Sequence, residues 1–481
     1  MGLKMGNEKT KQTKEKVTEW HVNGLTYTKM GLAALFIWLL WGDFCFTLME
    51  QVKPRVLPLY LMGKAGGLNA SNSVTNLMMY IIPGITGIVI GPIVSFKSDR
   101  YRSKRGRRIP FITWTAPFLV MALVGIGFAP QYKAFFTHIG GLFGLSPRTL
   151  TLLTIGFFVA LFHFMDEFVN SVFWYLFADV VPEEFLGRFL AIFRIVGAGA
   201  AAIFNFFIFP HAETSMHLIF VGAGMIYLFG FGLMCLRVKE GEYPPPDDIG
   251  DNPTILDQIK IYIQECFGHR IYWLMFAYRI CLAFAISASA GAIIFNRDGI
   301  GLSLTDIGRV SAIAGILIMV VQYPAGWAVD KFHPLRITLM MKVPVIIVQL
   351  IAFFYLRDLK TFILLEGLKL IFFTLHGAAD VPMMIMLFPR DKYGQFCSCN
   401  GLMKASGMML GAILAGIFMD YMTNFGADKF AYRWMYIWTA LWQLAGISFL
   451  VGVYIIWKKR GGADGYTAPG SAREKEQLAT I

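Results

Sequence analysis

Charged residues are scarce in this sequence. Only 15% of its 481 residues are Asp, Glu, Lys or Arg, against about 25% in a typical soluble domain. The six cysteines show neither metal-site spacing nor a disulfide framework. The eight histidines show no paired metal-ligand spacing, so the sequence predicts no metal site, no cofactor and no membrane enzyme. Short segments of alternating hydrophobicity are also missing, which argues against a transmembrane β-barrel.

Long apolar runs are abundant instead. Hydrophobic residues make up 56% of the chain and the mean hydropathy is +0.57, and the runs have the length of about 20 residues that crosses a bilayer. The sequence predicts an all-α integral membrane protein with twelve transmembrane helices. We expect them at about 30–49, 74–96, 109–129, 150–178, 189–209, 216–236, 270–295, 305–328, 336–356, 360–388, 395–421 and 433–457. Pro54 and Pro58 are expected to end the first helix.

The net charge of +12 follows the topology. Cations cluster near the N-terminus, in the loop at 98–108 and in other loops on one side of the predicted helices, as the positive-inside rule requires. This distribution argues against nucleic acid as a partner. It predicts a multi-pass protein of a bacterial inner membrane or other plasma membrane, with both termini cytoplasmic. No cleavage site follows the first apolar run, so we expect that helix to be retained.

The two halves of the chain resemble each other. Asp330-Lys331 lies between helices eight and nine as Asp99-Arg100 lies between helices two and three. The segments 182–189 and 389–396 also correspond. We predict a cytoplasmic tail (1–25), a six-helix bundle (26–237), a linker with an amphipathic helix (238–269), a second bundle (270–458) and a cytoplasmic tail (459–481). Such a pseudo-symmetric pair places the substrate site between the halves.

The basic loop carries a family resemblance. Asp99-Arg100 followed by Gly106-Arg107-Arg108 resembles the loop between helices two and three of major facilitator transporters. The stretch 91–111 is also similar to glycoside-pentoside-hexuronide cation symporters and to sucrose transporters, over most of the first half but weakly in the second. The resemblance implies the major facilitator fold and sugar transport by alternating access. It also implies that these residues, with Asp330 and Lys331 in the second half, form a gate that closes in the outward-facing state.

One departure from that branch bears on the coupling ion. Its sodium-coupled members carry two carboxylates on helix two, where this chain has Gly87 and Gly91. Glycine offers no side-chain oxygen to a hard cation. We therefore expect proton coupling or facilitated transport rather than sodium coupling.

Ionisable residues inside the predicted spans mark candidate sites, because they are costly in a bilayer. Helix one carries Asp43 and Glu50. Helix four carries four polar residues on one face, namely His163, Asp166, Glu167 and Asn170. Two alignments with the family leave open which of them matches its helix-four carboxylate. The alternative role of this face is an interhelical pair that holds the bundle together.

Other candidates come from the resemblance and from spacing. Asp43 and Arg194 match residues of the melibiose-permease type, Lys404 matches its helix-eleven lysine, and we expect Asp43 or Asp166 to pair with a buried Arg194. Trp41 and Trp174 are candidates for stacking on a sugar ring. Further along, Glu366, Lys369, His376 and Asp380 share one face of helix ten, where His376 and Asp380 form an i, i+4 pair that suits a proton relay. Arg279 could pair with the helix-ten acids, and Asp380 or a helix-two carbonyl could pair with Lys404.

These observations together predict a monomeric transporter that moves a sugar or glycoside with protons. The substrate-site candidates are Trp41, Asp43, Asp166, Asn170, Trp174, Arg194 and Lys404. The proton-coupling candidates are Glu50, His163, Asp166, Glu167, His376 and Asp380. The alternatives are a facilitator and a transporter of an organic anion or a peptidoglycan fragment. The histidine spacing argues against a membrane enzyme, and the paired-bundle repeat argues against a channel.

Overall fold

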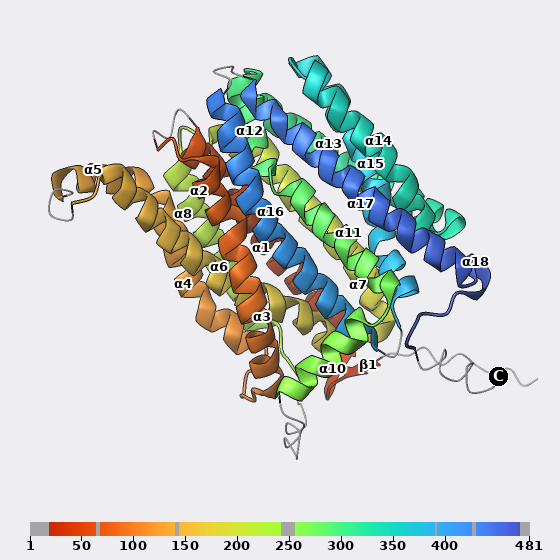
Figure 1. Ribbon diagram of the computed structural model, residues 1–481. Coiled ribbons are helices and arrows are strands. Elements are labelled where there is room, and N and C mark those ends of the chain that lie inside the picture. Colours follow the sequence, from red (N-terminus) through yellow and green to blue (C-terminus); the bar gives the residue numbers. More distant parts are fainter. Residues whose placement is uncertain are drawn as a thin grey trace, which may run out of the picture.

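The computed structural model describes residues 19–63, 68–139, 144–241, 255–389, 392–425 and 430–471 (Figure 1). Within them, twelve helices are long and apolar enough to cross a membrane, which confirms the predicted all-α membrane fold. The spans of the first half are α1 (Lys29–Met62), α2 (Asn72–Asn76) continued by η2 (Leu77–Ile81) and α3 (Ile82–Arg100), α4 (Ile109–Gly127), α6 (Pro147–Val180), α7 (Glu183–Ile203) continued by η4 (Phe204–Ile208) and η5 (Phe209–His211), and α8 (Met216–Ile226) continued by η6 (Tyr227–Phe231) and α9 (Gly232–Arg237).

The second half repeats this pattern. Its spans are α11 (Arg270–Ile286) continued by η7 (Ser289–Gly291), α12 (Ala292–Ile294) and η8 (Phe295–Gly299), then α13 (Leu304–Phe332), α14 (Pro334–Tyr355), α15 (Leu359–Leu387), α16 (Tyr393–Phe425) and α17 (Trp434–Lys459), which η10 (Ala431–Arg433) precedes. The predicted amphipathic helix of the linker is α10 (Ile255–Phe267). A short helix, α18 (Gly462–Gly465), follows the last span.

Corresponding helices make corresponding contacts in the two halves. In the first half α4 packs against α6 and α8, α3 packs against α6, and α1 packs against α7. In the second half α14 packs against α15 and α17, α13 packs against α15, and α11 packs against α16. This repeat agrees with the two pseudo-symmetric bundles predicted from the sequence. The halves meet where α16 lies along α2 and where α13 lies along α7, as Figure 1 shows for α16 and α2.

Helix α1 is longer than predicted. It continues through Pro54 and Pro58 to Met62, although the sequence predicted that these prolines would end it. Each proline removes one backbone N–H, but neighbouring helices in a membrane bundle can satisfy the freed carbonyls. Residues 50–62 are therefore part of the bundle. Lys53 and Arg55, which a loop would expose, are only partly accessible there.

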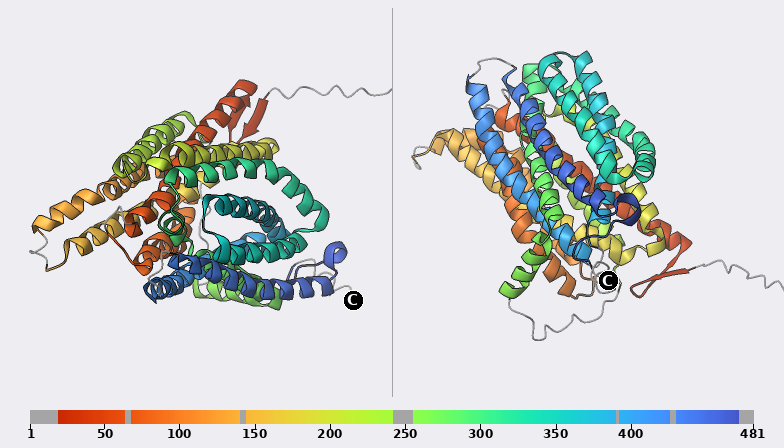
Figure 2. Two further views of the ribbon diagram at one scale, coloured as in Figure 1. Left: turned by 90° about the horizontal axis from the view of Figure 1, so that it is seen from above. Right: turned by 45° about the vertical axis from the view of Figure 1, so that its right-hand side comes forward.

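Two further elements were not predicted. Helix α5 (Ala129–Ile139) lies in the connection between the spans expected at 109–129 and 150–178, and it packs along α6. The three views show α5 and the start of α6 extending away from the bundle (Figures 1 and 2). Before α1, the strands β1 (Glu19–Val22) and β2 (Leu25–Thr28) form an antiparallel hairpin. Its two turn residues, Asn23 and Gly24, have positive φ of 45° and 80°, as tight hairpin turns require.

Candidate functional site

A polar cluster lies between α1 and α6 inside the first half. Lys53 Nζ on α1 lies 3.9 Å from Asp166 Oδ2 on α6. Glu50 interacts electrostatically with both of these residues and with Asp43. Glu167 interacts electrostatically with Asp166 and Lys53. The structure thus brings together the acids that the sequence singled out on helices one and four, around a lysine that it did not.

The cluster holds more negative than positive groups. Among the described residues, Glu50, Asp166 and Glu167 each interact with Lys53, and Glu50 also interacts with a fourth acid, Asp43. Asp43 and Asp166 are buried, with 2% and 7% of their surface exposed. Burying an unpaired carboxylate costs several kcal/mol, roughly, unless the group binds a proton or a cation. This part of the bundle is therefore suited to proton binding.

Several polar atoms of the cluster lack a hydrogen-bond partner. Thr47 Oγ1 donates a weak hydrogen bond of 3.3 Å to Asp43 Oδ1, and Ser171 Oγ donates one of the same length to Glu167 Oε1. Among the described residues no partner is found for Asp43 Oδ2, Asp166 Oδ1 or His163 Nε2, all of them buried. Buried polar atoms usually have partners, so a proton, water or solute can satisfy these positions.

Other candidates of the first half lie outside this cluster. Arg194 on α7 is exposed, so the predicted buried pair with Asp43 or Asp166 is wrong. Asp166 pairs with Lys53 instead, and Gly197, one turn further along α7, lies beside Asp43, since a Cβ at this glycine would be 3.4 Å from Asp43 Oδ2.

Two tryptophans and an asparagine complete the first-half set. Trp41 and Trp174 are 43% and 50% exposed. Trp41 stacks on Phe44, and Trp174 contacts the ring of Phe193 on α7. Asn170 lies half-buried on α6, one turn beyond the acids. These side chains can contact a solute without taking part in the charge cluster.

A second polar cluster lies inside the second half. Arg279 on α11 forms an ion pair of 2.7 Å with Asp380 on α15 and donates through Nε to Asn400 Oδ1 on α16 at 3.0 Å. The predicted pairing of Arg279 with a helix-ten acid is confirmed. His376 Nε2 instead bonds to Tyr278 Oη at 2.9 Å. The proposed relay between His376 and Asp380 is thus replaced by two separate contacts to α11.

Two lysines of the second half are placed differently from what the sequence indicated. Lys404 is exposed, and because Asp380 pairs with Arg279, the predicted pair of Asp380 with Lys404 is wrong. Lys342 on α14, which was not predicted, is 2% exposed and donates to Gln443 Oε1 at 2.8 Å. The sequence signal that could have indicated a buried Lys342 was its position inside an apolar run. The second half therefore buries more cations than acids, the reverse of the first half.

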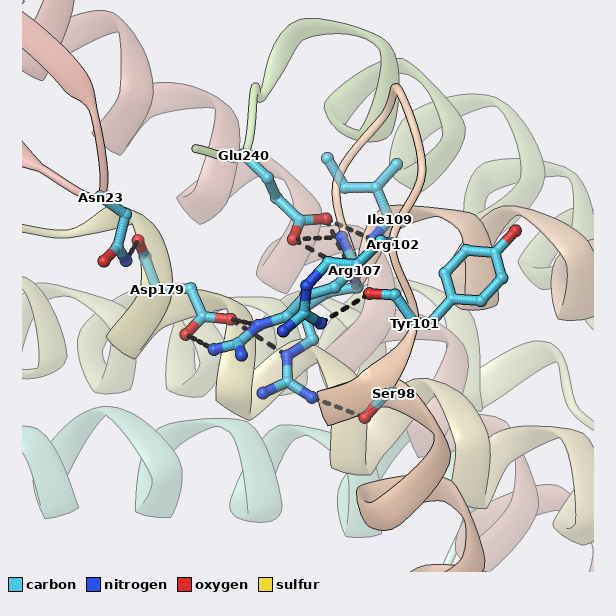
Figure 3. A network of polar contacts seen from close by, with 9 residues as sticks. Asn23, Ser98, Tyr101, Arg102, Arg107, Ile109, Asp179 and Glu240 are labelled. Atoms are coloured by element: carbon cyan, nitrogen blue, oxygen red, sulfur yellow. Dashed lines mark hydrogen bonds and ion pairs between the residues drawn. The ribbon is translucent and has the colours of Figure 1, made fainter. Parts of the chain in front are cut away.

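The basic loop forms a clamp within the first half (Figure 3). The Glu240 carboxylate, just beyond α9, accepts the backbone N–H groups of Arg107, Arg108 and Ile109 at 2.9, 2.9 and 2.6 Å. These N–H groups open α4, so the acid caps that helix. Gly106 has a φ of +98°, and a side chain there would clash with Glu240. Neither Glu240 nor its role was predicted.

The same loop binds the end of α6. Arg107 holds Asp179 with two hydrogen bonds of 3.0 and 2.6 Å. Arg108 Nε reaches Asp179 Oδ2 at 3.0 Å, and Arg108 Nη1 reaches Ser98 at 2.5 Å. Bidentate arginine–carboxylate pairs are among the stronger polar contacts in proteins. The loop therefore ties together α3, α4, α6 and the segment after α9 at one end of the bundle, which we call the basic end.

The remaining gate candidates are only partly described. The side chains of Asp99, Arg100 and Asp330 lie outside the described part of the structure. Lys331 is exposed, and its Nζ lies 4.7 Å from the ring centroid of Trp327, one turn earlier on α13. Such cation–π contacts are worth about 0.5–1 kcal/mol at exposed sites. The gate role predicted for Asp99 and Asp330 stays a prediction.

Polar contacts join the two halves at the opposite end of the bundle. The Asp420 carboxylate on α16 accepts the backbone N–H groups of Asn72 and Ser73, at the start of α2, at 2.7 and 3.1 Å. It also accepts the side chains of Asn72 and Ser73 at 2.9 and 2.6 Å. Tyr80 on η2 and Ser289 on η7 share a hydrogen bond of 2.9 Å. These contacts hold the halves together at the end remote from the basic loop.

An ion pair and a close helix approach strengthen this junction. Arg297 on η8 pairs with Glu213, which follows η5 in the first half. A side chain at Gly416 on α16 would lie 2.8 Å from the backbone of Ser73, so only glycine permits this approach of α16 to α2. The junction was not predicted from the sequence, because its residues belong to predicted loops and helix ends far apart in the chain.

Two bundles of six spans with ionisable groups buried in each define a membrane transporter of the type that works by alternating access. The sequence pattern described as the Major Facilitator Superfamily matches residues 141–387, just over half of the chain. The chain belongs to the major facilitator superfamily.

Solved structures show the same fold at low sequence identity. A bacterial homologue of the human lysosomal transporter Spinster, in an inward-facing and unoccupied conformation, is 14% identical with a TM-score of 0.63, over 91% of this chain and 98% of that one. The nucleoside transporter NupG is 13% identical with a TM-score of 0.62, over 87% and 99%. A D-xylose–proton symporter is 13% identical with a TM-score of 0.60, over 89% and 97%. These neighbours show the major facilitator fold.

Proposed function

We propose that this protein moves a sugar or glycoside across the membrane together with protons. The observation that supports proton coupling is the excess of acids around Lys53 in the first half. Asp166, Glu167 and Glu50 cannot all be ionised beside one lysine in an apolar bundle without a large cost, so one or more hold a proton when the site is dry. Opening the site to water favours loss of that proton.

The proposed substrate path uses polar and aromatic side chains of the first half, some of them buried and others exposed. Asp43 and Asn170 offer hydrogen-bond acceptors and donors to hydroxyl groups, and Trp41 and Trp174 offer faces for stacking on a sugar ring. Arg194 and Lys404 are exposed and can reach a solute from α7 and α16. The D-xylose–proton symporter among the structural neighbours supports both the substrate class and the coupling ion.

We further propose that the basic end faces the cytoplasm, because short basic loops stay on that side. Both termini are then cytoplasmic, and the junction made by Asp420 closes the extracellular end. The chain would thus adopt the inward-facing state, as the Spinster homologue does. In the outward-facing state we expect Asp99 and Asp330 to close the cytoplasmic end instead.

One observation favours a second substrate class. Arg194 and Lys404 are exposed and have no acidic partner among the described residues. Two such cations suit a carboxylate or phosphate, so an organic anion or an anionic peptidoglycan fragment is the second candidate.

Uptake into proteoliposomes tests the proposal. Labelled glucose, xylose and sucrose are offered with and without an inward proton gradient, and gluconate is offered as the anionic counterpart of glucose. We expect uphill uptake of a neutral sugar that the gradient drives and that Asp166→Asn abolishes. Asp358→Asn, an exposed acid outside the cluster, is the matched control and should transport normally. Gradient-independent uptake would leave a facilitator, and uptake of gluconate alone would identify an anion transporter.

A further inference from the structure

A cavity lies inside the second half, and the cavity described between the corresponding helices of the first half is far smaller. A cavity of about 430 Å³ lies between α11–η8, α13, α14, α15 and α17. The corresponding helices of the first half, α1, α4, α6 and α8, enclose only about 10 Å³, beside Lys53 and Phe162. Ligand pockets in proteins are commonly about 300–1,000 Å³. The space in the second half is therefore large enough for a solute, and it lies within one bundle rather than between the two.

The side-chain oxygen of a buried asparagine in the cavity wall has no partner within the described part of the chain. Asn296 is 9% exposed, and no hydrogen-bond partner of its Oδ1 is found among the described residues. The wall also contains Gln349 and Gln443, and the acceptor of Gln443 is already used by Lys342. A buried acceptor without a donor is costly. An incoming hydroxyl or N–H group would satisfy Asn296.

The charges in the wall cancel. Glu366 and Lys369 on α15 line the cavity and form an ion pair of 2.6 Å with each other. The rest of the wall consists of amides, hydroxyls such as Thr439 and Tyr436, and apolar side chains. A charged solute would have to separate the ion pair to find a counter-charge. The wall therefore suits an uncharged solute that has hydroxyl groups on one side and an apolar face on the other.

The seventh span is interrupted where it lines the cavity. Helix α11 ends at Ile286, and the chain then passes through η7, α12 and the π-helix η8 before Gly299. Ser289 on η7 and Asn296 on η8 both line the cavity. Interrupted spans and π-helical turns are frequent at the binding sites of transporters, because they free backbone and side-chain groups for a ligand.

The cavity also touches the junction between the halves. Ser289 lines the cavity and shares its hydrogen bond with Tyr80 on η2 of the first half. A solute that binds beside Ser289 competes for, or strengthens, a contact that closes this end of the bundle. The cavity wall and the closing contact therefore share one side chain, Ser289.

We propose that this cavity is a binding site for a neutral, hydroxyl-bearing solute of sugar size, held by Asn296, Gln349 and Gln443. The inference rests on the proposed function, because it names a site for the same class of solute inside the second half. It differs from the substrate path proposed above, which uses residues of the first half and the space between the halves.

Equilibrium binding of labelled glucose, xylose and sucrose to the purified full-length protein tests this site. Asn296→Leu removes the unpartnered acceptor at similar volume, and we expect the dissociation constant to rise about tenfold, as for the loss of one buried hydrogen bond. Ala314→Leu fills the cavity from α13 and should abolish binding while leaving the melting temperature of the unliganded protein unchanged or raised. Asn205→Leu is the matched control, since Asn205 is also a buried asparagine with an unpartnered Oδ1 in a π-helix but does not line the cavity.

The outcomes separate this proposal from the proposed function. Weaker binding in Asn296→Leu and Ala314→Leu, with Asn205→Leu binding as the wild type does, supports the cavity site. Wild-type affinity in both cavity variants overturns the cavity site and leaves proton–sugar transport standing. Binding lost equally in Asn205→Leu also overturns it, because the effect is then general to the bundle. If no neutral probe binds the wild type while gluconate does, the proposed sugar substrate is wrong and the cavity site is rejected with it.

Discussion

Replacing Asp420 with alanine should open the end of the bundle remote from the basic loop. The carboxylate accepts four hydrogen bonds from Asn72 and Ser73, two from backbone N–H groups at the start of α2 and two from side chains, at 2.6–3.1 Å. All four cross from one half to the other. They are therefore lost as a unit when this end opens.

The size of the effect follows from the kind of bond. A hydrogen bond to a charged group contributes about 1.5–3 kcal/mol net, and the favourable field of a helix N-terminus adds about 0.3–1 kcal/mol. Because the four bonds share one half-buried carboxylate that water can solvate after opening, we expect about 3 kcal/mol in total, or about a 100-fold shift toward the open arrangement. Asp420→Asn keeps one acceptor oxygen and should shift the equilibrium only about tenfold.

Distances between two spin labels measure this shift. Labels at His211 and Lys360, which are exposed at this end of the first and second halves, report the separation of the halves once the native cysteines are replaced. Asp358→Asn is the matched control, because Asp358 also caps a helix start, through Thr361 at 2.8 Å, but within its own half. We expect longer distances in Asp420→Ala and a wild-type distribution in Asp358→Asn. Unchanged distances in Asp420→Ala would refute the role of this contact.

Three further perturbations have outcomes fixed by local geometry. Gly106→Ala forces a side chain into Glu240 at a positive φ and should destabilise the protein by about 2 kcal/mol. The loss is measured as a lower melting temperature. A melting temperature equal to that of the wild type would contradict the clamp. Arg279→Met leaves Asp380 without its cation and should cost about 3 kcal/mol in thermal unfolding, with partial recovery in Arg279→Lys; equal stability of all three proteins would show that the pair is dispensable. Burial lowers the pKa of His333, so the folded protein favours the neutral imidazole. Burial of the neutral His333 imidazole therefore stabilises the folded protein above the unfolded pKa of about 6.5, and this stabilisation is lost as the pH falls below that value. His333→Gln should flatten this dependence in unfolding curves from pH 8 to 5, and an equally steep curve would exclude His333 as its source.

The architecture was predictable because it depends on patterns that are local in the chain. Apolar runs of bilayer length locate the spans, and the corresponding short motifs reveal the repeat. The errors also have local causes. Pro54 and Pro58 predict a helix end in water, but α1 continues through them inside a membrane bundle. The junction at Asp420 depends on residues about 350 positions apart, as the separation of 348 between Asn72 and Asp420 shows, and no local pattern reports it.

The sequence predicted which ionisable residues belong to the candidate site better than it predicted which of them pair. Helical spacing placed Asp166 and Glu167 on one face, and the structure brings them to the acids of α1. Their cation, Lys53, was missed because it was assigned to the region after the first helix. Arg279 pairs with an acid of helix ten, as predicted, whereas Arg194 is exposed and pairs with neither predicted acid. Which cation meets which acid depends on the rotation of each helix about its axis, and side-chain type alone does not determine that rotation.

The proton coupling proposed for the acids of the first half has a bioenergetic consequence. When a proton crosses with an uncharged solute, each cycle carries net charge, so transport responds to the membrane voltage as well as to the pH difference. One elementary charge moved through 100 mV releases about 2.3 kcal/mol, which sustains about a 50-fold accumulation of the solute at one proton per cycle. A cell that held its pH gradient near zero could still concentrate the solute. Substituting Asp166 would then make the carrier indifferent to voltage.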